Sequence, residues 1–142
     1  MFSKSCEYAI RAVIIISKNS KSNLKTNVKE ISISAGVPEQ YIAKVLQILS
    51  KQNIIQSYKG PHGGFFIDEK HQKIKLIEIV TAIDGESLFT SCGLGLHECS
   101  EKNPCPLHNS FKGIRNDIKK MLQKTSLNEL SENLQESLFK AK

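Results

Sequence analysis

The chain opens with hydrophobic residues repeated at helical spacing. From Ser5 to about Lys18 they recur every three or four positions, which predicts a strongly apolar first helix. Polar residues 18–27 then indicate a loop. The apolar positions of the first helix are Tyr8, Ala9, Ala12, Val13 and Ile16.

A short helix, a glycine-containing turn and a second amphipathic helix follow. Asn27-Val-Lys-Glu30 has the form of a capping box, and Gly36 ends the short helix that it opens. Pro38 suits the first turn of a helix that runs to about Gln52. Together these elements predict a helix-turn-helix. The apolar face of its second helix consists of Ile42, Val45, Leu46 and Leu49.

Residues off that apolar face are candidates for reading DNA. In a helix-turn-helix, the N-terminal part of the second helix enters the major groove. Gln40 and Lys44 point away from the apolar face and suit hydrogen bonding in a groove. Tyr41 lies in the same turn, where packing and contact with a phosphate are equally good interpretations. We therefore expect Gln40, Tyr41 and Lys44 to contact DNA.

A glycine-rich hairpin is predicted next. Two short β-type runs within Ile54–Ile67 flank Lys59-Gly-Pro-His-Gly-Gly64. After a helix-turn-helix, such a hairpin is typical of the wing of a winged helix. Its glycines, Gly63 among them, allow the backbone to approach a phosphate or the minor groove, and Lys59 and His62 add hydrogen-bond donors.

Three more helices are predicted in the second half. Lys75–Asp84 is apolar and ends at Gly85, Pro106 begins a longer helix, and Ser126-Leu-Asn-Glu129 opens a final short one with a capping box. The helix from Pro106 has an apolar seam at heptad-like spacing. The seam must be buried against its own domain or against the same helix of a second subunit. It consists of Leu107, Phe111, Ile114, Ile118 and Met121, with Leu122 beside it.

These elements predict a mainly α fold with a small β wing. We expect a winged helix-turn-helix DNA-binding domain at residues 1–85 and a cysteine-rich cluster-binding loop at 86–106. A long dimerisation helix and a C-terminal helix would occupy 107–142. The length of 142 residues agrees with one compact domain that carries an appended helix.

Positive charge is concentrated in the part assigned to DNA binding. The formal net charge is +6. Residues 1–60 contain nine lysines and arginines against three acids, whereas residues 61–142 contain eleven of each. With the helix-turn-helix, this distribution favours double-stranded DNA as the partner over a basic face that is merely solvated.

Nothing in the sequence predicts insertion into a membrane. The first residues lack the apolar core of a signal peptide, and the best apolar run, Ala12–Ile16, is too short to span a bilayer. We therefore expect a cytoplasmic protein without a membrane partner. Cytoplasmic thiols stay reduced, so clustered cysteines favour metal binding or redox sensing over disulfides.

Three cysteines and a histidine lie within seventeen residues. Cys92, Cys99, Cys105 and His108 follow the spacing Cys-x6-Cys-x5-Cys-x2-His in a segment rich in glycine and proline. Thiolates are soft ligands that hold iron–sulfur clusters, zinc or copper(I). A flexible loop allows closely spaced thiols to converge on one centre. The spacing differs from the paired Cys-x2-Cys of a common zinc finger.

The motifs of this chain, taken in their order, resemble those of a known family. Cys6-Glu-Tyr-Ala-Ile-Arg-Ala12, the helix-turn-helix, Lys59-Gly-Pro-His-Gly-Gly-Phe65 and Ile83-Asp-Gly85 precede the three-cysteine loop. In this order they resemble the Rrf family of winged-helix transcriptional regulators, whose iron–sulfur members include the IscR and NsrR types. The resemblance covers nearly the whole chain. It implies a homodimer built on the long helix after the loop, with transcription controlled by the cluster.

The resemblance also implies the ligands of the cluster. Cys92, Cys99 and Cys105 match the family's three thiolate ligands. His108 matches the histidine ligand of the IscR type, which holds a 2Fe–2S cluster. Glu7 lies where the NsrR type presents an aspartate from the other subunit to a 4Fe–4S cluster. We favour His108, and with it 2Fe–2S over 4Fe–4S, because His108 shares a contiguous segment with the thiols.

The sequence thus predicts a homodimeric transcriptional regulator, not an enzyme, whose DNA affinity depends on an iron–sulfur cluster. The signal would be iron, redox state or nitric oxide. One alternative is a winged-helix regulator with a structural zinc ion, or no metal, at the same site. Another is an iron–sulfur carrier or redox protein, against which the sequence offers no nucleophile–base pair and no nucleotide-binding loop.

Overall fold

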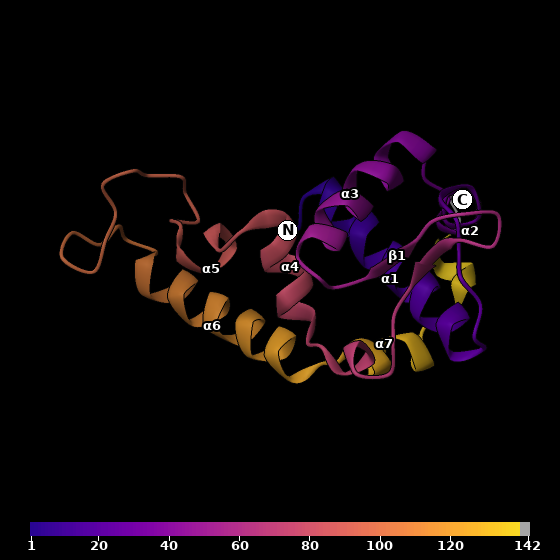
Figure 1. Cartoon of the computed structure of the whole chain (residues 1–142). Helices are drawn as coiled ribbons and strands as arrows, with labels where there is room; N and C mark the ends of the chain where they lie inside the picture. The colour runs from indigo at the N-terminus through magenta and orange to yellow at the C-terminus, as the bar shows by residue number, and fades with distance from the viewer. Residues whose placement is uncertain (140–142) are drawn as a thin grey trace.

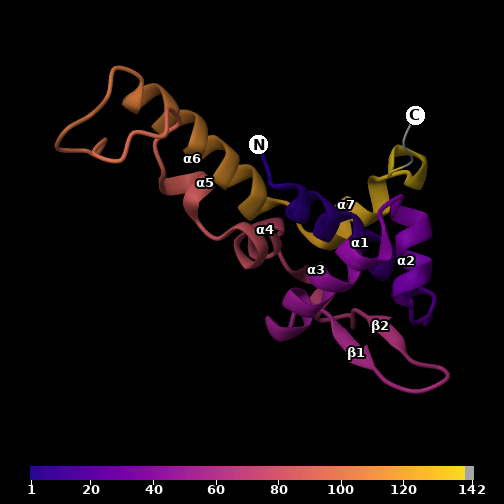
Figure 2. The ribbon, with the colours of Figure 1, turned by 90° about the horizontal axis from the view of Figure 1, so that it is seen from above.

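The computed structural model describes residues 1–139, so the last three residues of segment 107–142 lie outside it. Most helices pack around one core, and α6 projects from it as an arm with residues 91–107 at its far end (Figures 1 and 2). No helix of this described part has an apolar stretch long enough to cross a membrane. The elements are α1 Lys4–Lys21, α2 Val28–Ala35, α3 Glu39–Lys51, β1 Gln56–Tyr58, β2 Gly64–Phe66, η1 His71–Lys73, α4 Leu76–Asp84, α5 Ser87–Thr90, α6 His108–Lys124, α7 Leu127–Asn133 and η2 Glu136–Phe139.

The first helix is longer than predicted. It continues to Lys21, so the prediction of a loop over residues 18–27 is wrong for its first four positions. The polar side chains there are helical because they find partners within the fold. Ser20 is buried and accepts a hydrogen bond from the backbone N–H of Ile67 at 2.9 Å. Lys18 donates to a backbone carbonyl just after α7.

The helix-turn-helix of α2 and α3 confirms the prediction. The Asn27 side chain accepts from the Glu30 N–H, and the Glu30 carboxylate accepts from the Asn27 N–H, which completes the capping box. Gly36 ends α2 in the left-handed region at φ 67°. Helix α3 begins directly after Pro38. The residues predicted to form its apolar face are at most 2% exposed: Ile42, Val45, Leu46 and Leu49.

The wing is a two-stranded antiparallel hairpin, as predicted, with Ser57 opposite Phe65. The segment between α1 and α2 adds a further bridge to it. Thr26 donates its N–H to the Phe65 carbonyl at 3.0 Å, and Phe65 donates to the Thr26 carbonyl at 2.8 Å. Gly64 permits this approach, because a Cβ there would lie 3.0 Å from the Thr26 backbone. The wing is therefore anchored to the body of the protein.

The segment that leads to the arm differs in detail from the prediction. Helix α4 ends at Gly85 as predicted, but the short helix α5 follows within the segment predicted as a loop. Helix α6 begins at His108 and not at Pro106. The residues before it belong to the loop, where the His108 N–H donates to the Cys105 carbonyl at 3.0 Å. Leu122, near the other end of α6, is 2% exposed in the common core.

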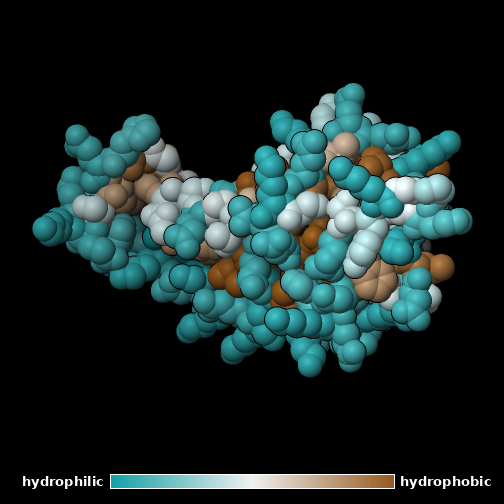
Figure 3. Space-filling model, in the orientation of Figure 1, coloured by the Kyte–Doolittle hydropathy of each residue, from teal (hydrophilic) through white to brown (hydrophobic). Residues whose placement is uncertain are grey.

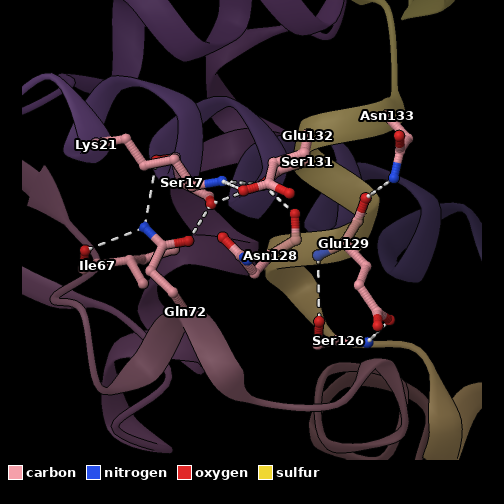
Figure 4. A network of polar contacts seen from close by, with 10 residues as sticks. All are labelled: Ser17, Lys21, Ile67, Gln72, Ser126, Asn128, Glu129, Ser131, Glu132 and Asn133. Carbon is pink, nitrogen blue, oxygen red and sulfur yellow. Dashed lines mark hydrogen bonds and ion pairs between the residues drawn. The ribbon is translucent and has the colours of Figure 1, made fainter.

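A buried polar network joins α7 to α1 (Figure 4). The Ser17 hydroxyl contacts the side-chain oxygen of Gln72 and lies 3.2 Å from the Ser131 hydroxyl. The Gln72 amide donates to the carbonyls of Ser17 and Ile67 at 3.2 and 3.4 Å. Lys21 donates to the Ser131 hydroxyl at 3.1 Å. These directional contacts fix α7 on the N-terminal helix, since buried polar groups need their partners.

Candidate metal centre and nucleic-acid interface

The three loop cysteines converge at the far end of the arm. Their Sγ atoms all lie within 4.8 Å of one another. Those of Cys92 and Cys105 are 3.9 Å apart. All three thiols are free and half-buried. The structure therefore brings together the three thiols that the sequence predicted as metal ligands, in a loop rather than on a rigid element.

Backbone turns produce this convergence. The Gly95 N–H donates to the Cys92 carbonyl at 3.0 Å, and the Cys99 N–H donates to the Leu96 carbonyl at 3.3 Å. Gly95 has φ 71°, a conformation that glycine adopts without strain. The Cys105 N–H then donates to the Sγ of Cys99 at 3.3 Å. A backbone donor aimed at sulfur favours the thiolate form, which is the form that binds metals.

His108 faces the thiols from the first turn of α6. Its Nδ1 lies 3.3 Å from the Sγ of Cys99, and its side chain is 10% exposed. Its Nε2 lies 3.4 Å from a carboxylate oxygen of Glu101 but makes no well-aligned hydrogen bond. Glu101 also pairs with Lys112 at 2.6 Å, and Lys112 first, then His108, lowers the pKa of Glu101. A carboxylate beside the remote nitrogen is a common way to orient a ligating imidazole.

Side chains of α6 hold the loop on both sides of Cys92. The Phe111 ring lies against Gly93, where an added Cβ would approach the ring carbons to 2.7 Å. On the other side, Arg115 donates to the backbone carbonyl of Ser91. The sequence motif did not identify these residues, because their role depends on how the loop folds back along α6.

The pKa values of two of the thiols are shifted in opposite directions. Hydrogen bonding from the backbone of Leu96, and then of Leu94, lowers the pKa of Cys92 to about 7. For Cys99, the backbone of Cys105 acts to lower the pKa, but burial and the two neighbouring thiols outweigh it and raise the pKa. Without a bound metal, Cys92 is therefore the thiol that ionises readily near neutral pH.

Glu7, the other candidate for a fourth ligand, lies on α1. Its carboxylate pairs with Lys4 at 3.2 Å and is 37% exposed. It does not belong to the group of thiols within this chain's described residues. Its neighbour Cys6 is fully buried, and burial, with Asp84 next, raises the pKa of Cys6 to about 12. Glu7 stays a prediction that requires a second copy of the chain, whereas Cys6 is a core residue.

The residues predicted to read DNA lie on the exposed side of α3. Gln40 and Lys44 are exposed. Tyr41 is 47% exposed, and its ring lies 5.9 Å from the ring of Tyr8 on α1, so it packs in part and remains accessible in part. Their contact with DNA stays a prediction.

At the tip of the wing, Lys59 and His62 are exposed. Gly63 makes the tight tip possible, because a Cβ there would lie 2.2 Å from the Tyr58 carbonyl oxygen. The backbone at this point is therefore free of side-chain bulk, as close approach to a nucleic acid requires.

Two further α3 residues line a groove between α3 and the wing. Gln47 and Lys51 border this groove together with Ser57 and Phe65 of the wing. The signal was present in the sequence, because Gln40, Lys44, Gln47 and Lys51 recur every three or four residues along one helical face. Only residues in the first turns of this helix were predicted to contact DNA, and Gln47 and Lys51 in its later turns were not.

Comparison with known proteins decides the family. Residues 2–133 match Rrf2, a family described as iron-dependent transcriptional regulators. The chain belongs to the Rrf2 family. This confirms the resemblance that the motifs indicated and the winged-helix fold class. Proteins of the Rrf2 family and the relatives below are transcriptional regulators and not enzymes.

Similar sequences cover almost the whole chain. An inferred HTH-type transcriptional regulator of Aquifex aeolicus is 30% identical over 141 residues, which covers 98% of this chain and 96% of the relative. The HTH-type transcriptional regulator IscR of Cronobacter sakazakii is 25% identical over 126 residues, covering 89% of this chain and 76% of the relative.

Solved structures share the fold. CymR, the global cysteine regulator of B. subtilis, matches with a TM-score of 0.78 at 18% identity, covering 95% of this chain and 98% of that one. T. potens IscR matches with a TM-score of 0.71 at 17% identity, covering 96% and 90%. A regulator of the winged-helix type binds DNA, and this Rrf2 chain adds three close cysteines that can bind a metal.

Proposed function

We propose that this Rrf2-family chain is a homodimeric regulator whose DNA affinity is controlled by an iron–sulfur cluster on Cys92, Cys99, Cys105 and His108. The observation that carries the proposal is the convergence of three thiols with the His108 imidazole 3.3 Å from one of them. When bound, such a cluster supplies a centre that responds to iron, oxygen, nitric oxide or redox state.

The donor set fits a tetrahedral metal. Two thiolates on one such metal lie roughly 3.8 Å apart, and a thiolate and an imidazole nitrogen roughly 3.5 Å. The pair Cys92–Cys105, at 3.9 Å, and the pair Cys99–His108, at 3.3 Å, both come close to these values. We favour a 2Fe–2S cluster over 4Fe–4S because the fourth donor beside the thiols in this chain is His108, the residue that matches the IscR type. The same four donors also form a Cys3His set for one zinc ion.

Helix α6 supports the homodimer. Ile114 and Met121 lie seven residues apart on this helix and are 56% and 52% exposed, and Leu107, the capping residue just before it, lies seven residues before Ile114 and is 44% exposed. Phe111 and Ile118, from the same predicted seam, are half-buried against their own chain. Part of the seam is therefore buried against its own chain, and the other part is left exposed for a second subunit. The exposed part has the heptad spacing that a partner helix buries. In Figure 3, the hydrophobic atoms on the visible face of the arm lie near its two ends, amid a mostly hydrophilic surface.

In the proposed complex, the dimer places two copies of α3 in successive major grooves, as two-fold regulators do. Gln40 and Lys44 would contribute to specificity. Tyr41, Lys59 and His62 would contact the backbone, which the tip of the wing at Gly63 approaches closely. Coupling of about 1–3 kcal/mol between cluster and DNA is enough to change affinity roughly 5- to 150-fold.

An anaerobic absorption spectrum with iron and sulfide counts tests the metal assignment. We expect visible sulfide-to-iron charge-transfer bands in the wild type, their loss in Cys105→Ala, and altered bands in His108→Ala. Unchanged bands in His108→Ala with loss of colour in Glu7→Ala would transfer the fourth position to Glu7. A colourless protein with one zinc per chain would contradict the cluster and leave a structural zinc site. The proposed function as a DNA-binding protein fails if the chain binds no duplex at low salt.

A further inference from the structure

The two faces of the wing have different surroundings. In an antiparallel hairpin, successive side chains point to opposite faces. Ser57 and Phe65, which are paired across the strands, lie toward the groove that borders α3. Tyr58 and Phe66 lie on the opposite face, which we call the outer face of the wing. Their rings meet edge to face with centroids 6.5 Å apart.

A lysine from outside the wing covers this outer face. The ammonium group of Lys25, in the segment between α1 and α2, lies 4.8 Å from the centre of the Tyr58 ring. Lys25 is exposed, and Tyr58 is 48% exposed. A cation at this distance from an aromatic ring is attracted by the ring's quadrupole, which limits the positions that the lysine samples. The pair therefore offers an oriented positive charge and a phenol hydroxyl to solvent.

The backbone next to Lys25 is fixed to the wing. Thr26 exchanges two hydrogen bonds with Phe65, at 2.8 and 3.0 Å. The Thr26 hydroxyl also accepts a hydrogen bond from the Asn19 amide at 2.9 Å. These hydrogen bonds hold the backbone beside Lys25 in a fixed position relative to the hairpin. The recess next to this face is lined by Lys21, Lys73 and Glu69, and Lys21 also pairs with Glu132 at 3.5 Å, so among the described residues the free positive charge on this side of the wing is that of Lys25.

We propose that Lys25 and Tyr58 bind a DNA backbone phosphate on the strand remote from α3. This inference rests on the proposed DNA-binding function. The minor groove is about 6 Å wide and is bounded by two phosphate backbones. A hairpin tip that enters it therefore has one backbone on each face. Lys51 and Ser57 contact the phosphate backbone on the face toward α3. Lys25 and Tyr58 contact the phosphate backbone on the outer face.

The salt dependence of binding tests this assignment. The probe is a duplex selected from random sequence by the wild-type protein. Each phosphate contact contributes about −0.9 to the slope of log K against log salt, so Lys25→Ala, which removes one contact per subunit, should make the slope of a homodimer less negative by roughly two. Affinity at about 0.1 M salt should fall around tenfold for all sequences alike. Lys25→Arg should retain the wild-type slope. Lys120→Ala, an exposed lysine on α6, is the matched control and should change neither quantity.

Phosphate ethylation interference supplies a second readout. In the wild type, ethylation of a phosphate beside the minor groove, on the strand that α3 does not face, should block binding. In Lys25→Ala that single interference should disappear while the others remain. The inference is overturned if wild-type binding is strong and Lys25→Ala leaves both the slope and the interference pattern unchanged. Failure of the wild type to bind any duplex would instead contradict the proposed function itself.

Discussion

At the residue scale, the position of Cys92 depends on its neighbours in the chain and on α6. Gly93 rests on the Phe111 ring, and Ser91 receives a hydrogen bond from Arg115. Neither contact involves a predicted metal ligand. The position of the candidate ligand Cys92 therefore depends on residues that a cysteine spacing does not reveal, a common arrangement around metal sites.

Replacing Gly93 with alanine should displace the loop. The new Cβ would lie 2.7 Å from Phe111 ring carbons, so the ring or the loop must move. We expect Gly93→Ala to lower iron content severalfold while the helical circular dichroism is retained. Gly113→Ala is the control on the same arm, because its Cβ would meet no atom within 4 Å. It should leave iron content unchanged and stabilise α6 by up to about 1 kcal/mol. Equal iron content in both variants would contradict the role given to Gly93.

The thiols of the metal-free protein should react at different pH values. The pKa of Cys92 is lowered to about 7, so its thiolate is half-formed there and its alkylation rate should level off above that pH. Cys6 should stay unmodified in the native protein, since burial raises its pKa to about 12. Alkylation at pH 6 to 9, followed by peptide mass spectrometry, measures both. Faster modification of Cys6 than of Cys92 would show that the environments are wrongly assigned.

At the element scale, α6 has two apolar faces. Leu122 is 2% exposed and belongs to the core, whereas Ile114 is 56% exposed one heptad from Met121. The first face holds the helix on its own chain, and the second is available to a second subunit. A heptad pattern alone does not distinguish the two, because both faces are apolar.

Substitutions on these two faces should have different effects. Ile114→Glu should convert the dimer to monomer without loss of folding, because it places a charge only in the proposed interface. Leu122→Ala should instead destabilise the fold by about 2–5 kcal/mol through a core cavity. Sedimentation velocity and thermal unfolding separate these outcomes. A monomeric wild type, or an Ile114→Glu variant that stays dimeric, would contradict the assignment of the exposed face.

Local sequence signals predicted most of the elements. The capping boxes at Asn27 and Ser126 and the stops at Gly36 and Gly85 depend only on neighbouring residues, and the structure confirms all four. The end of α1 was predicted too early, because Ser20 looks like a loop residue until its partner Ile67, the residue after β2, is known. Short α5 and the bridge from Thr26 to the wing also depend on tertiary contacts that periodicity does not encode.

At the scale of the whole molecule, the wing and the cysteine loop lie at opposite ends (Figures 1 and 2). A physical link starts at Asp84, the last residue of α4. Asp84 accepts a hydrogen bond from the Ser3 N–H at 3.0 Å and contacts the Ser3 hydroxyl, which caps α1. The segment that leaves α4 for the loop is thereby tied to the helix against which α3 packs. The contact between Asp84 and Ser3 thus connects the cysteine loop, through α1, to helix α3.

The residues of the candidate metal site were likewise predicted only in part from the sequence. Spacing identified all three thiols and His108, since the residues lie close together in the chain. It did not identify Glu101, Phe111 or Arg115, which reach the site only after the loop folds along α6.

The central claim is that occupancy of the thiol loop sets DNA affinity. The most direct measurement is the affinity of one anaerobic preparation for the selected duplex, at fixed salt, before and after iron removal by a chelator, with Cys105→Ala beside it. The account predicts at least a fivefold change in affinity, in either direction, on iron removal, with Cys105→Ala behaving like the stripped protein under both conditions. An iron-loaded protein that binds the duplex with the same affinity as its stripped form and as Cys105→Ala would contradict it.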